Sequence, residues 1–542
     1  MKKNAVYDNS ATLWWLGLNA FLIVNLTLCA LILFLLRPLW FDINKFIIAA
    51  SGLDLNWAVI VLTTTVALVF YFSFAFTRHK QRALTPPFSL SYKVFCLLIL
   101  VLWNAMFALL LTELKEEKRL LVSSFIETLP LIVTFIVAAL LLFIVPKMKI
   151  FNNNAIKWVL CVFIVLAPIL VSHSLNSFTL ISGPYLQSPS QTSMTVMWLT
   201  SKDSKGYVEF GQGDVKQNKR QNASHGLVDV GRIHKVVLNG LQPATTYKYR
   251  IVAKEVTAFM PYNVNFGDII TSEEFSFTTA DKNAKSVSFL VFNDVHENAN
   301  TVADLLEAAD APEHDYVFYN GDIISHIDDE NQIRNALIDP SVNSFAQSKP
   351  FTLVRGNHET RGAFARDLPR YISSPDDKYY SSFVAGGVYF LIMDSGEDKA
   401  DDDVEYSGLV AFDDYRTEQT NWLKRQMETE EYKQAKFRVA LMHMPIFGAP
   451  DQQDGVDDAA EKWGPLFNQG KLDILLAGHT HAYDVVEPNE GIHNYPIIIG
   501  GGNNPGERTV MQVKAEGGLL QVLMIRDDGE TVADYQLTSN NK

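Results

Sequence analysis

The sequence has 542 residues, more than one ordinary domain holds, and 48% of them are hydrophobic. Its 60 acidic residues exceed its 46 basic ones, for a net charge of −14, which argues against non-specific binding to nucleic acid. The three cysteines, Cys29, Cys96 and Cys161, lie in the apolar first third. Residues after this third therefore cannot form a disulfide or a thiolate metal site among themselves.

Five apolar stretches in residues 1–176 predict membrane-spanning helices. Each is close to the roughly 20 residues that cross a bilayer, and none contains Asp, Glu, Lys or Arg. The expected helices cover residues 13–36, 57–76, 94–111, 129–145 and 158–175. Transport pathways usually need charged groups inside the membrane, so we expect an anchor, with lipid binding as the alternative.

The distribution of Lys and Arg predicts how this region is oriented. Basic residues are denser before the first stretch, between the second and third, and between the fourth and fifth. Basic loops face the cytoplasm, so the N-terminus is expected there. Five crossings then place everything after residue 175 on the outer side, which is the periplasm in a bacterium.

Residues 177–280 predict a small all-β sandwich, because short alternating strands recur there. The segment MTVMWLT places Trp198 in the expected core. The run LNGLQPATTYKYR, residues 238–250, resembles the fibronectin type III domain that precedes the catalytic domain of purple acid phosphatases. This domain carries no chemistry of its own, so it is expected to be a spacer or a wall of a site.

After residue 286, five apolar strands each end in polar residues of a restricted kind. The five groups are Asp294 with His296, Gly321 with Asp322, the run Gly356-Asn357-His358-Glu359, His443, and Gly478 with His479 and His481. Helix-compatible stretches, such as residues 302–309 and 417–429, separate the strands, which indicates βα units. Ligands of such sheets bind outside the carboxyl ends of the strands, so the five groups are expected to converge on one face.

These side chains suit metal ions. Asp, His and Asn offer oxygen and nitrogen ligands that fit Mn, Fe or Zn, and the glycines let the backbone approach the ions. A lone histidine is more often an ordinary surface or core residue, and His314, His326 and His493 are interpreted in that way. Five ordered groups at five strand ends are poorly explained by chance.

The ordered set resembles the calcineurin-like metallophosphoesterase superfamily over residues 286–502. The run YYSSFVAGGVYFLIMDSG, residues 379–396, and the preceding sandwich resemble its purple acid phosphatase branch. The resemblance implies an α/β catalytic domain with four αββα layers over residues 286–542. It implies two divalent metal ions: the first held by Asp294, His296 and His481, the second by Asn357, His443 and His479, with Asp322 bridging them.

The resemblance also assigns His358, a histidine that is not a ligand, to the leaving group. The sequence departs from the purple enzymes, which have Gly and Tyr where this chain has His296 and Ser325. The iron-bound tyrosine that gives their colour is thus missing, and no purple protein is expected. The acidic residue that supports the histidine in related protein phosphatases is missing as well, which leaves open what orients His358.

The predicted function is a membrane-anchored phosphoesterase that hydrolyses phosphate mono- or diesters by attack of a metal-bound hydroxide. The substrate is expected to be a phosphate ester, with lipid-linked or cell-envelope compounds slightly favoured by the anchor. Arg355 and Arg361 flank the Asn357 turn and either meet phosphate or form salt bridges. The acidic stretch at residues 396–405 is interpreted as a solvated loop. The alternative function is a phosphate-ligand sensor or membrane-linked binding protein with the same fold, although loss of ligands would mark such a protein.

Overall fold

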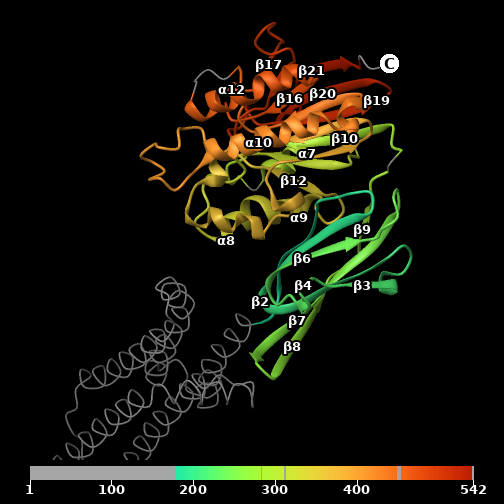
Figure 1. Cartoon of the computed structure of the whole chain (residues 1–542). Helices are drawn as coiled ribbons and strands as arrows, with labels where there is room; N and C mark the ends of the chain where they lie inside the picture. The colour runs from blue at the N-terminus through green and yellow to red at the C-terminus, as the bar shows by residue number, and fades with distance from the viewer. Residues whose placement is uncertain (1–176, 282, 299, 311–312, 449–452, 540–542) are drawn as a thin grey trace, which may run out of the picture. The chain divides into compact units, whose positions relative to one another are not determined.

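The computed structural model describes residues 177–281, 283–298, 300–310, 313–448 and 453–539 (Figure 1). The five expected membrane spans lie outside these residues. Within the described ranges, no helix is at once long enough and apolar enough to cross a membrane. The chain divides into two compact units, and the unit made of Phe178–Val256 and Phe266–Lys542 holds the α/β domain and the β domain described below, apart from residues Thr257–Asn265 of the β domain.

The first described domain is all β. Its seven-stranded sheet contains β1 (Leu180–Gln187), β2 (Ser193–Gly211), β3 (Asn218–Arg220), β6 (Gly231–Asn239), β7 (Thr246–Met260), β8 (Asn263–Thr271) and β9 (Phe275–Thr278). Strands β4 (Ala223–Ser224) and β5 (Leu227–Val228) form a separate small ribbon. The long strand β2 pairs with β6 over residues 193–199 and with β7 over residues 204–211. Trp198 lies fully buried in this domain's core, as its alternating segment predicts.

Two six-stranded sheets form the centre of the α/β domain. The first runs in the order β12 (Phe351–Val354), β11 (Tyr316–Asn320), β10 (Ser286–Phe292), β19 (Thr509–Glu516), β20 (Leu519–Arg526) and β21 (Thr531–Thr538). The second runs in the order β13 (Ser381–Ala385), β14 (Val388–Ile392), β15 (Phe437–Leu441), β16 (Ile474–Ala477), β18 (Ile497–Ile499) and β17 (Asp484–Val486). Strands β10 to β12 are parallel, and so are β14, β15, β16 and β18.

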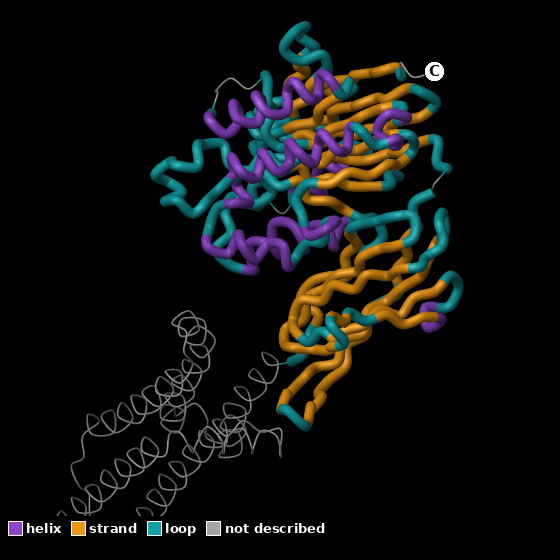
Figure 2. Tube along the Cα trace, viewed as in Figure 1, coloured by secondary structure: helices purple, strands orange, loops and turns teal. Residues whose placement is uncertain are grey.

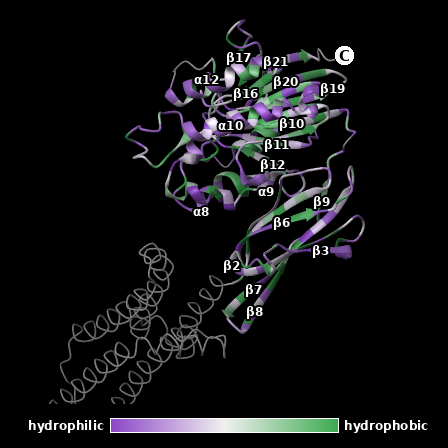
Figure 3. Ribbon diagram, viewed as in Figure 1, coloured by the Kyte–Doolittle hydropathy of each residue, from purple (hydrophilic) through white to green (hydrophobic). Residues whose placement is uncertain are grey.

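The two sheets pack face to face, and helices cover their outer faces (Figure 2). One apolar cluster joins the sheets through residues such as Phe289, Phe318 and Val439. The outer layers contain α7 (Thr301–Ala308), α8 (Glu330–Ile333) and α9 (Asp339–Ser344) on one side and α10 (Phe412–Met427), α11 (Glu430–Gln434) and α12 (Asp454–Gln469) on the other. Figure 3 shows that hydrophobic residues concentrate on the central strands. Residues 286–538 therefore form an α/β domain, in agreement with the predicted fold class.

The β domain is built into the side of the first sheet. The Tyr185 hydroxyl donates to the carbonyl of Tyr371 at 2.7 Å, and the Tyr249 hydroxyl donates to the carbonyl of Gln347 at 2.7 Å. Met197 and Leu199 share an apolar cluster with strands β10 to β12. The first hydrogen bond is buried and the second is partly buried, so the β domain is structurally joined to the α/β domain.

Candidate metal centre

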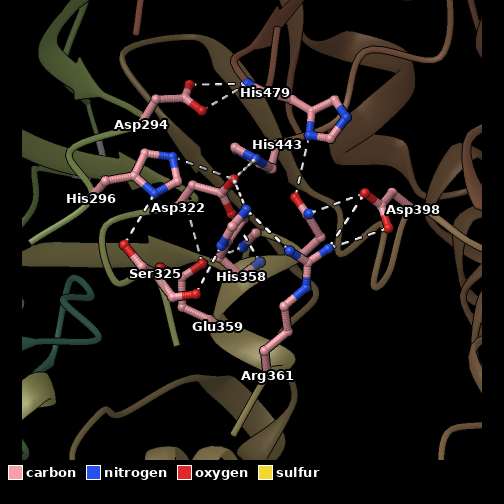
Figure 4. A network of polar contacts seen from close by, with 12 residues as sticks. Asp294, His296, Asp322, Ser325, His358, Glu359, Arg361, Asp398, His443 and His479 are labelled. Carbon is pink, nitrogen blue, oxygen red and sulfur yellow. Dashed lines mark hydrogen bonds and ion pairs between the residues drawn. The ribbon is translucent and has the colours of Figure 1, made fainter. Parts of the chain in front are cut away.

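The structure brings all seven predicted metal ligands together at the carboxyl ends of five strands. Figure 4 labels Asp294, His296, Asp322, His443 and His479 among them. Asp294, His296, Asp322 and His481 form one group in which the candidate ligand atoms all lie within 4.8 Å of one another. Asp322, His443 and His479 form a second group. The amide oxygen of Asn357 lies 3.2 Å from Nδ1 of His479, beside this second group. The grouping follows the division that the family resemblance implies, with Asp322 in both halves.

Backbone strain is concentrated in these residues. Five of the seven have φ between 46° and 73°, namely Asp294, His296, Asp322, His479 and His481. This left-handed conformation is uncommon for residues other than glycine and costs about 1–3 kcal/mol each, so it persists where surrounding structure imposes it. The strain turns the side chains out of the strand direction and toward one another.

Two glycines make room for the ligands. Gly321 has φ of 85°, and a Cβ atom there would lie 2.3 Å from the His443 ring. A Cβ atom on Gly356 would lie 2.3 Å from Oδ1 of Asp322. These glycines therefore let the backbone pass close to the side chains of the candidate ligands. A larger residue at either position would displace those side chains.

Hydrogen bonds fix the position of Asp294 in the first group. Asp294 is buried, and its Oδ2 accepts from Nδ2 of Asn293 at 2.7 Å and from the backbone N–H of His479 at 2.9 Å. Nε2 of His296 lies 3.0 Å from Nε2 of His481. Burial lowers the pKa of His296 to about 4 and also lowers the pKa of His481, so both rings are neutral and carry a lone pair for a metal.

The second group holds a buried histidine nitrogen against a buried carboxylate. Nδ1 of His443 donates to the carbonyl of Asn320 at 2.8 Å, which leaves Nε2 to face the site. Nε2 lies 3.0 Å from Oδ2 of Asp322. A protonated His443 would form an ion pair with Asp322 here, and a metal ion bound to both side chains would take the place of that proton.

The electrostatics of the site also call for a cation. Burial lowers the pKa of His443, but the carboxylates of Asp322 and Asp294 outweigh burial and raise that pKa to about 10. Burial raises the pKa of Asp294 to about 7. Without metal, the site therefore takes up protons to balance its buried carboxylates. Two divalent ions fit this donor set of Asp, His and Asn without thiolates, and their identity as Mn, Fe or Zn stays a prediction.

Asn357 is oriented by a residue from a distant loop. Its Nδ2 points to Oδ2 of Asp398 at 3.5 Å, which leaves Oδ1 on the side of His479. Asp398 and Glu397 are both buried. The prediction of a solvated loop is therefore wrong for this end of the acidic stretch, because its first carboxylates pair with Arg361.

His358 is held at both ring nitrogens. Nδ1 lies 2.8 Å from the carbonyl of Ser325, which can only accept, so the proton is on Nδ1. Nε2 lies 3.2 Å from Nη1 of Arg361 and 3.9 Å from Oδ2 of Asp322. The main chain of Ser325 thus does the orienting work that the sequence left open. The Ser325 hydroxyl lies 3.4 Å from Nδ1 of His296.

Glu359 is a positioning residue that the sequence reasoning did not assign. It is buried, and its carboxylate accepts from four backbone N–H groups, those of Asp322, Ile323, Ile324 and Gly356, at 2.7–3.0 Å. It therefore fixes the loop that carries Asp322 against the loop that carries Asn357. The only available signal was a carboxylate directly after the Asn-His pair.

The two arginines beside the Asn357 turn have different roles. Arg355 is directed away from the centre, pairs with Asp394 at 2.7 Å and lies over the ring of Tyr379 at 4.1 Å. Arg361 lies at the centre, where it contacts His358 and forms ion pairs with Glu397 and Asp398. Of the two, only Arg361 remains in reach of a substrate.

Comparisons with known proteins agree with this geometry. Residues 287–483 match the family model described as calcineurin-like phosphoesterase, and residues 182–279 match the purple acid phosphatase N-terminal domain. Among similar proteins, purple acid phosphatase 18 of Arabidopsis thaliana is 24% identical over 57% of this chain and 68% of its own length. Acid phosphatase type 7 of Danio rerio is 23% identical over 58% of this chain and 72% of its own length.

Among solved structures, a purple acid phosphatase isolated from yellow lupin (Lupinus luteus) seeds has a similar fold. The TM-score is 0.50 at 15% identity, over 66% of this chain and 74% of that one. The comparisons confirm the family resemblance derived from the motifs. The two matched family models cover residues 182–279 and 287–483.

Proposed function

We propose that this chain, which belongs to the calcineurin-like phosphoesterases and carries a purple acid phosphatase N-terminal domain, hydrolyses phosphate esters at a centre of two divalent metal ions. The observation that carries the proposal is the pair of ligand groups sharing Asp322. Asp294, His296 and His481 would hold one ion, and Asn357, His443 and His479 the other. When bound, two such ions activate water and offset the negative charge that develops on the phosphoryl oxygens.

We assign His358 to the leaving group. Hydrolysis forms a bond from a water oxygen to phosphorus and breaks the bond from phosphorus to the ester oxygen. Protonated His358 gives its Nε2 proton to that departing oxygen, and the ring regains a proton from solvent. The Ser325 carbonyl keeps the other proton on Nδ1, so the ring presents Nε2 to the site. Its side chain is 27% exposed, which leaves Nε2 accessible to substrate.

Arg361 positions this ring. Its guanidinium is fixed by Glu397 and Asp398, and the remaining Nη1 is directed at Nε2 of His358. In this contact Nη1 donates to Nε2, so a substrate would have to displace it before the protonated ring could face the ester oxygen. Asp398 also orients the amide of Asn357. The loop that carries Asp398 therefore positions both His358, the proposed proton donor, and Asn357, a proposed metal ligand.

Residues 1–176 are proposed to anchor the enzyme in a membrane with its catalytic domain on the outer side. This part of the proposal is supported by the five uncharged apolar stretches and the distribution of Lys and Arg. Such an anchor favours a lipid-linked or cell-envelope phosphate ester as substrate. Protease digestion of sealed cells or spheroplasts tests it, because a catalytic domain on the outer side would be digested and one on the inner side would be protected.

The test of the reaction uses detergent-solubilised full-length protein with manganese. Release of nitrophenol from p-nitrophenyl phosphate and from its bis ester is compared in the wild type, Asn357→Ala and the exposed control Asn489→Ala. We expect activity in the wild type and the control and its loss in Asn357→Ala. Preference for one ester would separate a phosphatase from a phosphodiesterase. A protein that binds both metals and cleaves neither ester would contradict the proposal and favour a sensor.

A further inference from the structure

A long β-hairpin of the β domain ends in an uncharged, exposed apolar tip. Strands β7 and β8 form it, and β8 is the edge strand of the sheet (Figure 1). Residues 257–266 read TAFMPYNVNF and contain no Asp, Glu, Lys or Arg, whereas 20% of the chain is charged. Phe259 is 68% exposed, Tyr262 is fully exposed, and Phe266 and Ile269 are exposed as well. Exposed apolar patches of this kind usually mark an interaction surface.

The domain does not need this tip for its own core. The apolar cluster of the β domain includes Tyr247, Tyr249 and Ile251 from the first half of β7 and no residue from the tip. Exposing aromatic surface to water costs about 25 cal/mol per Å². Folding of the domain therefore does not explain the tip, and a partner would.

The hairpin leaves the sheet at the end where the chain enters it. The backbone N–H of Ser201 donates to the carbonyl of Thr179 at 2.9 Å, so the start of the domain lies beside residue 201 of β2. Ser204, three residues further along β2, pairs with Glu255 of β7. The entry of the chain and the base of the hairpin are thus neighbours on one strand.

The chain just before this entry is the last expected membrane span, residues 158–175. Three residues from 175 to Phe178 cover at most about 10 Å, so this end of the sheet would lie close to the bilayer surface. The seven residues from Glu255 to Tyr262 extend roughly 20 Å in strand conformation. The hairpin is therefore long enough to reach the bilayer from its base.

We propose that residues 257–266 dock into the interfacial layer of the membrane that holds the N-terminal region. Tyr and other aromatic residues favour this layer, and an uncharged apolar tip enters it without burying a charge. Nζ of Lys254 lies 4.4 Å from the Phe266 ring, at the level where lipid headgroups would begin. The proposal rests on the membrane anchor in the proposed function and is independent of the hydrolytic reaction.

A second attachment would fix the orientation of the catalytic unit. A single linker lets a domain rotate over the membrane, whereas a linker and a hairpin together hold it in one orientation. The β domain transmits this restraint, because Tyr185 and Tyr249 bind it to the α/β domain. The metal centre would then face a defined direction relative to lipid-linked substrates.

The experiment places a photoreactive benzoylphenylalanine in the full-length chain reconstituted into lipid vesicles. Tyr262→benzoylphenylalanine tests the tip, and Leu227→benzoylphenylalanine, at a 77% exposed position elsewhere in the β domain, is the matched control. We expect lipid adducts at position 262 and none at position 227, with nitrophenyl ester hydrolysis unchanged in both variants.

Two results would overturn the proposal. One is co-flotation of the Tyr262 variant with vesicles but without lipid adducts, whether or not position 262 cross-links to a second copy of the chain. That result rejects the docking of the hairpin and leaves the proposed membrane anchor and the proposed hydrolysis unaffected. The other is failure of the chain to float with vesicles at all, which rejects the anchor together with the docking. Loss of ester hydrolysis in the wild type, by contrast, rejects the catalytic proposal and has no bearing on the hairpin.

Discussion

His234 in the β domain and His443 in the α/β domain are 3% and 0% exposed, and their surroundings differ. The His234 ring stacks on Trp198 with centroids 4.8 Å apart, and its Nε2 lies 2.7 Å from the Ser204 hydroxyl. In His443, Nδ1 donates to the carbonyl of Asn320 and Nε2 lies 3.0 Å from the buried carboxylate of Asp322. The His234 ring therefore contributes to packing, whereas the His443 ring is positioned to bind a ligand.

The pKa values of the two histidines are also shifted in opposite directions. Burial lowers the pKa of His234 to about 4, so this ring is a neutral part of an apolar core. Around His443, buried carboxylates outweigh burial and raise the pKa to about 10. The comparison teaches that burial alone does not identify a functional histidine. Surplus buried carboxylates around the ring do so, and backbone strain marks five of the other candidate ligands beside it.

The largest effect is expected at the carboxylate that both ligand groups share. Asp322→Asn should lower kcat/KM for nitrophenyl phosphate by roughly 10³-fold or more, about 4 kcal/mol, because both metal positions lose a charged ligand. Steady-state kinetics and metal analysis measure this. Asp528→Asn, at an exposed carboxylate, is the control. An Asp322→Asn protein with full activity would show that the shared carboxylate is not part of the catalytic centre.

The second effect concerns the stability of the α/β domain. Glu359→Gln should lower its free energy of unfolding by about 4 kcal/mol, since an amide accepts at only one end and leaves two buried N–H groups unpaired. Urea unfolding followed by tryptophan fluorescence measures the change. The exposed control Glu428→Gln should be neutral. Equal stability of the two variants would remove Glu359 from the account of how the site is positioned.

The third effect belongs to the β domain and depends on pH. The unfolded chain protonates His234 near its ordinary pKa of 6.5, and the folded chain does so only near 4. The unfolded state therefore binds more protons between these values, so stability is full above pH 6.5 and falls toward pH 4, by up to about 3 kcal/mol.

Melting temperatures measured from pH 7 to pH 4 test this dependence. His234→Phe should flatten it, and His225→Asn, at an exposed turn position with positive φ, should leave it as in the wild type. A His234→Phe protein that loses stability with acid as steeply as the wild type would assign the dependence to other groups.

The smallest of these effects is expected at His358. His358→Gln should slow hydrolysis of alkyl phosphates by roughly 10²-fold and slow that of nitrophenyl phosphate less, because nitrophenolate leaves without a proton. Arg361→Lys should change the ratio of the two rates in the same direction, since the ring loses its neighbour. Rates for a series of leaving groups measure both. An equal loss for all leaving groups would indicate that His358 binds phosphate instead of donating a proton.

Much of the α/β domain could be predicted from the sequence, and so could the groups of polar residues at its strand ends. Apolar runs ending in Asp, His or Asn predicted five strand ends, and parallel strands place such ends on one edge. The helix expected at residues 302–309 is α7, and the one expected at residues 417–429 is α10, which begins earlier, at Phe412. Helix boundaries shift in this way because capping contacts come from the folded structure.

The supporting residues could not be predicted in the same way. Asp398 and Glu397 reach Asn357 and Arg361 across about 40 residues of chain, and no periodic pattern records such pairs. The group that orients His358 is a backbone carbonyl, which any residue at position 325 would supply. The identity of residue 325 therefore could not predict how His358 is oriented. The five expected spans lie outside the described residues and stay predictions.

The most direct test of the central claim is the number of metal ions per chain. The full-length protein is loaded with manganese, freed of excess metal and analysed by mass spectrometry of the elements, with His481→Ala and His479→Ala alongside. The two ligand groups predict two ions in the wild type and one in each variant, with ester hydrolysis only in the wild type. One ion or none in the wild type, or hydrolysis that persists in the metal-free protein, would contradict the account.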